Sequence, residues 1–288
     1  MRLNGLAVLS NAARTPFVSS MVLCTCLLIS VVACGPKQGG AESAQGATAV
    51  TSKEVTYSSG STQLKGFIAY PAGSKKRPAV LVAHEWWGLT AYVRARALKL
   101  AEAGYVAMAV DLYGEGKHTE HAAEAKEFMM AAISNVEESK KRFEAAQTLL
   151  ASDPRVDGSK LAAIGYCFGG ANVLHMARFG DNQLKLVGSF HGNLATQHPL
   201  EKDVFKGKIF VAQGGDDSFV PAEQVATFKQ EMDAAGADYE LVEYPGAKHG
   251  FTNPKATELG LQNQLPIAYS AEADNASWAR FMELLGAL

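Results

Sequence analysis

Three residues that could share one nucleophilic reaction lie in the second half of the chain. Cys167 stands between Gly165 and Gly169 in the stretch Ile-Gly-Tyr-Cys-Phe-Gly-Gly. Asp217 precedes Ser-Phe-Val-Pro, and His249 precedes Gly-Phe. A thiol can attack a carbonyl carbon, and an imidazole can take or share the thiol proton and later activate water. A carboxylate can hold the imidazole in one tautomer and stabilise its charged form. Together these residues predict covalent catalysis by a Cys-His-Asp triad.

The sequence around Cys167 predicts a sharp turn between a strand and a helix. A short buried strand is expected at 161–164 and an apolar helix at 171–179. A nucleophile at the tip of such a turn is the nucleophile elbow, G-x-S-x-G, here with Cys in place of Ser. Small neighbours let a strained central residue close the turn, and the free N–H groups of the following helix favour a thiolate. The alternative is a buried structural cysteine in a glycine-rich turn.

The rest of the chain alternates between predicted strands and helices. Strands are expected at 54–58, 64–70, 79–83, 105–110, 186–190, 209–212 and 239–244, and helices at 92–103, 222–235 and 272–285. The first two strands should form a hairpin, and the charged segment 114–152 is expected to be helical and to cover the site as a lid. The alternation favours a mostly parallel sheet with helices on both faces. Ligands bind such sheets beyond the carboxyl ends of the strands, and all three candidate residues follow strands.

The order of the three residues along the chain is informative. Nucleophile, acid and base follow one another as they do in the α/β-hydrolases, so we expect that fold. Each residue alone has a simpler interpretation. Asp217 could cap the next helix, with Asp216 competing for its role, and His249 could be a hydrogen-bonded loop histidine. Three matches in order, each after a strand, favour the triad.

The same segments resemble the dienelactone hydrolase family. The similarity lies in Gly-Tyr-Cys-Phe-Gly-Gly around Cys167, in Asp-Ser-Phe-Val-Pro from Asp217 and in His-Gly-Phe from His249. Two further segments, His-Glu-Trp-Trp-Gly-Leu from His84 and Asp-Leu-Tyr-Gly from Asp111, also resemble family segments. The resemblance covers residues 54–285. It implies a hydrolase of a small carboxylic ester or lactone that works through an acyl-thioester and needs no cofactor or metal.

The resemblance also implies roles for residues beyond the triad. The backbone N–H groups of Phe168 and Trp86 would form the oxyanion hole. Glu85 would contact the resting thiol and could accept its proton, and desolvation in an apolar pocket should raise its pKa. A purely structural, hydrogen-bonding role for Glu85 is the alternative. The other aromatic residues predicted to line the substrate pocket are Trp87, Tyr113, Phe219 and Phe251.

Two positions depart from the family pattern. Members of the family hold the carboxylate of their substrate with arginines, but this chain has Glu115 and Asn253 at the matching places. The sequence therefore favours a neutral ester, lactone or thioester. His191, after a predicted strand, and His175, inside the helix after the elbow, are expected to be structural.

The first 33 residues predict an export signal. Arg2 and Arg14 precede an apolar run, and Val-Val-Ala-Cys at 31–34 resembles a bacterial lipobox. Cys34 would then be lipidated and become the first residue of the mature protein. The alternatives are a signal cleaved near Ala33 and an uncleaved membrane anchor. Each places the protein outside the cytoplasm, facing the periplasm or the cell exterior. The predicted divisions are a signal at 1–33, a lipidated Cys with a flexible tether at 34–52, and the hydrolase domain at 53–288.

The composition narrows the classes of function. Cys24 and Cys26 would leave with the signal, so the folded domain would keep Cys167 alone and could form no internal disulfide. The net charge is −2, and the sequence has no block of basic residues that would indicate binding to nucleic acid. No Cys or His pair has the spacing of a zinc site. We expect a monomer that acts on a small molecule. A non-catalytic envelope binding protein on the same fold and a thiol redox sensor remain as other hypotheses.

Overall fold

The sheet is the element that brings the candidate residues together. The computed structural model describes residues 49–288. The predicted signal and Cys34 therefore lie outside the described residues, and those expectations stay predictions. The strands are β1 (Val50–Ser59), β2 (Thr62–Pro71), β3 (Arg77–Ala83), β4 (Val106–Val110), β5 (Val156–Tyr166), β6 (Leu184–Phe190), β7 (Lys208–Gly214) and β8 (Tyr239–Tyr244).

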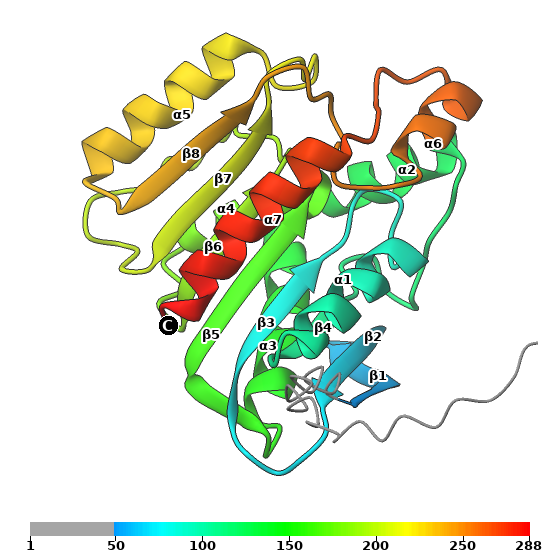
Figure 1. Ribbon diagram of the computed structural model, residues 1–288, viewed down its shortest axis with the longest axis vertical. Coiled ribbons are helices and arrows are strands. Elements are labelled where there is room, and N and C mark those ends of the chain that lie inside the picture. The colour runs from blue at the N-terminus through cyan, green and yellow to red at the C-terminus, as the bar shows by residue number, and fades with distance from the viewer. Residues whose placement is uncertain (1–48) are drawn as a thin grey trace, which may run out of the picture. The chain divides into compact units, whose positions relative to one another are not determined.

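These strands form one eight-stranded sheet in the order β1-β2-β4-β3-β5-β6-β7-β8. The hairpin of β1 and β2 is antiparallel and joins β4 in antiparallel fashion. All other neighbours run parallel. The carboxyl ends of the parallel strands therefore meet at one edge, at the top of Figure 1.

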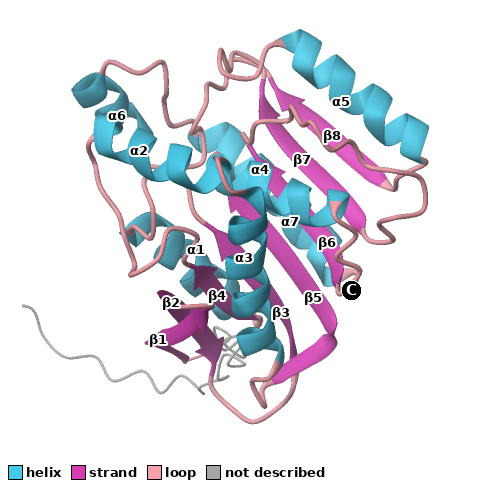
Figure 2. Cartoon of the chain, turned by 180° about the vertical axis from the view of Figure 1, so that it is seen from behind, coloured by secondary structure: helices cyan, strands magenta, loops and turns pink. Residues whose placement is uncertain are grey.

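Helices cover both faces of the sheet. They are α1 (Ala91–Glu102), α2 (Ala122–Ile133), α3 (Val136–Ala151), α4 (Phe168–Arg178), α5 (Ala222–Ala235), α6 (Ala256–Asn263) and α7 (Ala271–Gly286). Figure 1 looks onto the face covered by α1 and α7, and Figure 2 shows α3 and α4 on the other.

The central strands are apolar throughout because both of their faces are buried. In β3, Leu81 packs into the core beneath α3, α4 and α5, whereas its neighbours Val80 and Val82 pack into the core beneath α1 and α7. Successive side chains of a strand point to opposite faces, so one apolar run supplies both cores. This explains why a continuous apolar stretch predicts a central parallel strand.

Local signals set the helix ends. Asn135 caps α3 by accepting a hydrogen bond from Glu138 N, and Ser270 caps α7 by accepting one from Ala273 N. Gly236 ends α5 in the left-handed conformation, with φ of 63°. Local sequence signals therefore mark where these three helices begin or end.

The mostly parallel α/β-hydrolase fold is confirmed, but the charged segment 114–152 differs from the expectation. It contains two helices rather than one covering element. Only α2 lies beside the site, whereas α3 packs its apolar side, including Phe143 and Leu150, against the sheet. The helix α6 was not predicted from the sequence. Among residues 49–288, no helix is both long and apolar enough to cross a membrane.

Candidate active site

Cys167 occupies the turn between β5 and α4. Its backbone is in the left-handed region, with φ of 54° and ψ of −116°, a conformation that is costly for a residue with a side chain. Its N–H donates to Phe190 O at 3.0 Å. The flanking glycines are needed for space: a Cβ on Gly165 would lie 2.1 Å from Gly169 O, and one on Gly169 would lie 2.4 Å from Ala83 O. The predicted elbow is therefore present, with the thiol at its tip.

Asp217 and His249 meet at the same edge of the sheet. His249 Nδ1 lies 2.8 Å from Asp217 Oδ2. The carboxylate also accepts from Phe219 N at 2.9 Å and from Gln213 Nε2 at 3.0 Å, and its side chain is fully buried. Asp216, the competing candidate, is exposed. The acceptor at Nδ1 fixes the imidazole so that Nε2 is left for the substrate side.

The surroundings of His249 favour its charged form. Burial alone would lower the pKa of the imidazole, but the Cys167 sulfur and the Asp217 carboxylate outweigh burial and raise this pKa to about 10. Both groups interact favourably with a positive ring. These contacts therefore favour a protonated His249 facing the sulfur.

Glu85 follows β3 and is almost completely buried at 4% exposure. Burial raises the pKa of this carboxyl group to about 7, although the hydrogen bond from Asn253 and the charge of His249 oppose the rise. Asn253 Nδ2 donates to Glu85 Oε2 at 2.6 Å. The predicted contact between Glu85 and the resting thiol is not among the hydrogen bonds of residues 49–288, and it stays a prediction; the Asn253 amide engages one oxygen of the carboxyl group, Oε2.

Hydrogen bonds with residues that follow β4 hold the segment that carries Glu85 and Trp86. His84 Nε2 accepts from Leu112 N at 3.2 Å, so Nδ1 carries the proton and donates to Glu85 O at 2.6 Å. Burial lowers the pKa of His84, which agrees with a neutral ring. Tyr113 Oη donates to Trp86 O at 3.1 Å. These bonds fix the peptide groups on both sides of the Trp86 N–H.

Two backbone N–H groups beside Cys167 are without acceptors. Within residues 49–288, neither the Trp86 N–H nor the Phe168 N–H donates to a protein group. Phe168 is the first residue of α4, where the N–H groups have no partner within the helix. This is the state that an oxyanion hole requires before substrate arrives.

A cavity of about 460 Å³ opens onto the thiol. It is lined mainly by apolar side chains, together with Glu85, Cys167, His175, Asn193 and His249. A larger polar groove of about 840 Å³, between α3 and the carboxyl end of α4, does not reach the triad residues. Within residues 49–288, no group of three or more His, Cys, Asp or Glu is placed to hold a metal ion.

Two of the aromatic residues predicted for the pocket do line it, and two do not. Trp87 and Phe219 are part of the wall. Tyr113 lies behind the wall, stacked on Phe168 with ring centroids 5.4 Å apart, and Phe251 is fully buried in the core beneath α1 and α7. Sequence reasoning missed the apolar residues that complete the cavity, which are Met129, Ile133, Val220, Leu265 and Ile267. Apolar character alone does not single them out, because α2, which carries Met129 and Ile133, has many other apolar residues.

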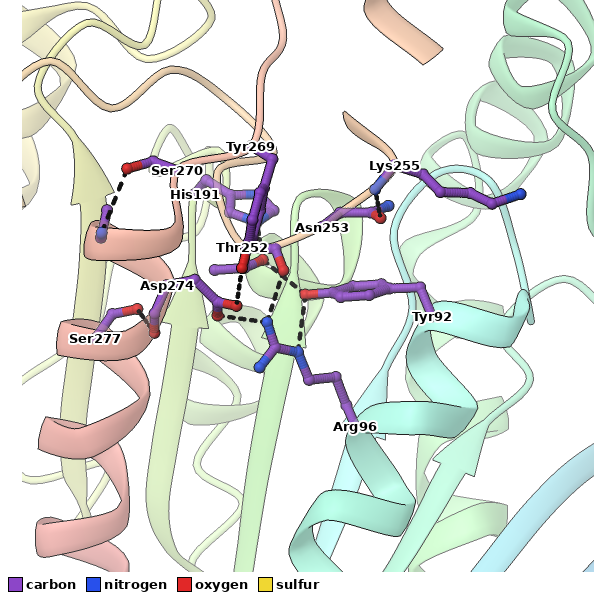
Figure 3. Close-up of polar contacts among 11 residues, drawn as sticks. Tyr92, Arg96, His191, Thr252, Asn253, Lys255, Tyr269, Ser270, Asp274 and Ser277 are labelled. Atoms are coloured by element: carbon purple, nitrogen blue, oxygen red, sulfur yellow. Dashed lines mark hydrogen bonds and ion pairs between the residues drawn. The ribbon is translucent and has the colours of Figure 1, made fainter. Parts of the chain in front are cut away.

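A buried polar network fixes the loop that carries His249 (Figure 3). Arg96 Nη2 donates to Thr252 O at 2.6 Å and to Asp274 Oδ1 at 2.5 Å. The Thr252 hydroxyl hydrogen-bonds with Tyr92 Oη at 2.6 Å and with His191 Nε2 at 2.7 Å. The loop is thereby tied to α1, α7 and the end of β6. A largely buried network of this kind restricts the loop to one position.

The match to a known family agrees with this geometry. Residues 64–288 match the model of the dienelactone hydrolase family. The chain belongs to the dienelactone hydrolase family. This membership confirms the predicted family and makes the protein a hydrolase.

Three relatives show how far the likeness extends. A dienelactone hydrolase-like promiscuous phosphotriesterase from metagenomic libraries is 32% identical, with a TM-score of 0.78 over 83% of this chain and 99% of that one. An uncharacterised protein of Caenorhabditis elegans is 33% identical over 147 residues, which are 51% of this chain and 91% of that protein. A Yersinia pestis protein provisionally named carboxymethylenebutenolidase is 26% identical over 240 residues, which are 80% of this chain and 86% of that protein.

The two departures from the dienelactone hydrolase pattern have different surroundings. Glu115 is exposed and does not line the cavity, so it cannot meet a substrate there. Asn253 is buried and pairs with Glu85. No Lys or Arg lines the cavity. Of the two histidines expected to be structural, His191 is buried with its ring centroid 5.1 Å from that of His249, whereas His175 lines the cavity.

Proposed function

We propose that this member of the dienelactone hydrolase family cleaves a small, neutral carboxylic ester or lactone by way of an acyl-thioester on Cys167. The observation that carries the proposal is the thiol on a strained elbow, facing an imidazole that Asp217 holds at 2.8 Å. A non-catalytic binding protein would not need this arrangement, and a dithiol redox site would need a second cysteine. Cys167 is the free cysteine among residues 49–288.

The proposed reaction has two stages. The Cys167 thiolate attacks the carbonyl carbon, and the carbonyl oxygen becomes an oxyanion that accepts from the N–H groups of Trp86 and Phe168. When the carbon–oxygen bond of the ester breaks, His249 gives its proton to the departing oxygen. The ring is then neutral and takes a proton from water, whose oxygen attacks the thioester carbonyl and releases the acid and the thiolate.

Glu85 has a supporting role in this proposal. Its carboxyl group lies in the same cavity as Cys167 and has a pKa raised to about 7 by burial. When ionised, it stabilises the protonated His249 and is a second acceptor for the thiol proton. We therefore expect turnover to rise with pH as Glu85 ionises.

The cavity favours an uncharged substrate. No cationic side chain lines it, and the buried carboxyl group of Glu85 would repel an anion. An anionic substrate would lose its hydration without a compensating partner. A neutral ester, lactone or thioester pays no such penalty.

The decisive experiment measures hydrolysis of p-nitrophenyl acetate by the full chain in mild detergent. Cys167→Ala should abolish turnover, whereas Cys34→Ala, which also removes one thiol, should retain it. Wild-type protein should bind one equivalent of iodoacetamide at Cys167 at neutral pH. Equal or absent turnover in wild type and Cys167→Ala, with slow labelling, would instead favour a binding protein on a hydrolase fold.

We further propose that the protein is exported and anchored by a lipid on Cys34. The support is the sequence pattern at 31–34, which resembles a lipobox. Mass spectrometry of the protein from the membrane fraction should find a lipidated amino-terminal Cys34, and Cys34→Ala should move the protein out of that fraction. An unmodified Cys34 in membrane-bound protein would refute the anchor.

A further inference from the structure

Two polar side chains in the cavity have no part in the proposed reaction: Asn193, which is exposed, and His175, which is half-buried on α4. Cys167, Ala171 and His175 follow one another at intervals of four residues, so they lie along one side of the helix. All three line the cavity. His175 is eight residues beyond Cys167, which is about 12 Å along the helix axis. The cavity therefore leads from the nucleophile along α4 to an imidazole.

The surroundings of His175 define what it can bind. Its Nδ1 is buried and has no hydrogen-bond partner in the described part of the chain, whereas Nε2 is not one of the buried unpartnered atoms. A buried N–H without an acceptor is rarer than a buried acceptor without a donor, so we place the proton on Nε2. Burial, assisted by the charges of Arg178 and His198, lowers the pKa of this ring to about 4. At neutral pH, His175 is an uncharged donor.

The other cavity walls indicate which half of the substrate reaches this donor. His249 protonates the departing oxygen, so the leaving group lies on its side of the cavity, where Leu265 and Ile267 form the wall. We infer that the acyl group extends the other way, along α4 toward His175. Met129 and Ile133 of α2 line the same cavity and offer it no hydrogen bond.

We propose that His175 recognises a neutral oxygen near the distal end of the acyl chain, as found in a hydroxyl, ether or keto group. The inference rests on the proposed ester hydrolysis and names the substrate class of that site: an uncharged, oxygenated acyl ester. A plain alkyl chain would cover the Nε2 donor without pairing it. Sites built to hydrogen-bond a substrate discriminate against analogues that lack the group for this reason.

The test compares two substrates of equal length on the full chain. One is p-nitrophenyl octanoate, and the other is the same ester with an ether oxygen in place of a methylene near the chain end. Wild type should prefer the oxygenated ester in kcat/KM by about fivefold, which corresponds to one neutral hydrogen bond of about 1 kcal/mol. His175→Leu and His175→Phe should each lose this preference.

A matched control distinguishes the loss of the His175 hydrogen bond from the loss of any nearby histidine. His198→Leu removes a neighbouring histidine that does not line the cavity and should keep the fivefold preference. Because the preference is a ratio within each variant, a lower yield of folded protein does not alter it. An unchanged ratio in both His175 variants, or no preference in wild type, would overturn the inference. Absence of p-nitrophenyl acetate turnover would instead refute the proposed function, so the two failures can be told apart.

Discussion

Two buried carboxyl groups lie close to His249, and their surroundings differ. Asp217, after β7, is met by three donors: His249 Nδ1, Phe219 N and Gln213 Nε2. Glu85, after β3, is met by the Asn253 amide alone, and burial raises its pKa to about 7. Both side chains carry the same chemical group and are buried to nearly the same extent. They differ in the number of hydrogen bonds that each carboxyl group accepts.

The difference indicates a division of labour. A carboxylate that accepts several hydrogen bonds is stabilised in its charged form, whereas a carboxyl group in an apolar pocket with one donor can gain and lose a proton near neutral pH. Asp217, fixed by its hydrogen bonds with Phe219 N and Gln213 Nε2, is suited to orient His249. Glu85 is suited to exchange a proton during turnover.

Removal of the charge at Asp217 should have the largest effect. In Asp217→Asn the amide can no longer hold His249 in the required tautomer or stabilise its positive charge, and we expect kcat for p-nitrophenyl acetate to fall by about 10³- to 10⁴-fold. Asp216→Asn changes the exposed neighbour and should stay within about twofold, since surface substitutions of this kind have small effects. Similar losses in both variants would contradict the assignment of Asp217.

Removal of the charge at Glu85 should have a smaller effect with a distinct pH signature. Glu85→Gln keeps an acceptor for Asn253 but cannot take a proton, and we expect a loss of about 100-fold, at the low end of general acid–base contributions. In wild type, kcat/KM should rise as pH increases through about 7, where Glu85 ionises. That limb should be missing from the profile of Glu85→Gln. An unchanged profile would assign Glu85 a structural role.

The same variant should be more stable than wild type at alkaline pH. The pKa of Glu85 is raised from 4.5 to about 7 in the folded state. Stability from the protonated form is therefore complete below pH 4.5 and is lost as pH rises through about 7. Thermal unfolding at pH 8 should show Glu85→Gln more stable by about 3 kcal/mol, since the pKa is raised by about 2.5 units and each unit corresponds to about 1.4 kcal/mol. At pH 4 the two proteins should unfold alike, and a destabilised variant at pH 8 would contradict the raised pKa.

Removal of the single donor to Glu85 should have the smallest effect. Asn253→Ala withdraws the hydrogen bond that favours the carboxylate, so the pKa of Glu85 should rise further. A bond of about 1 kcal/mol corresponds to a shift of about 0.7 pH units in the activity limb. Turnover at pH 7 should fall a few-fold and recover at higher pH. The double variant Glu85→Gln, Asn253→Ala should show no limb, and a limb that persists there belongs to another group.

Much of the architecture follows from the sequence because local signals and the global fold agree. Apolar runs without alternation indicate strands buried on two faces, and the chain order of Cys167, Asp217 and His249 places all three at the carboxyl ends of parallel strands. The need for Gly165 is equally local, since a Cβ there would collide with Gly169 O, whereas a Cβ on Gly169 would collide with Ala83 O on the neighbouring strand β3. Helix α6 was missed because its sequence, with exposed Leu261, has no continuous apolar stripe.

The sequence by itself determined the family and the fold, and it predicted which three residues the fold would bring to one edge of the sheet, because these depend on residue type and on the order of strands. Only the tertiary structure decided what surrounds them. That Asn253 donates to Glu85, that Phe251 lies in the core rather than the pocket, and that His175 lines the cavity all depend on which segments pack together. Side-chain direction at such sites is set by contacts between segments far apart in the chain, so a local sequence pattern does not predict it.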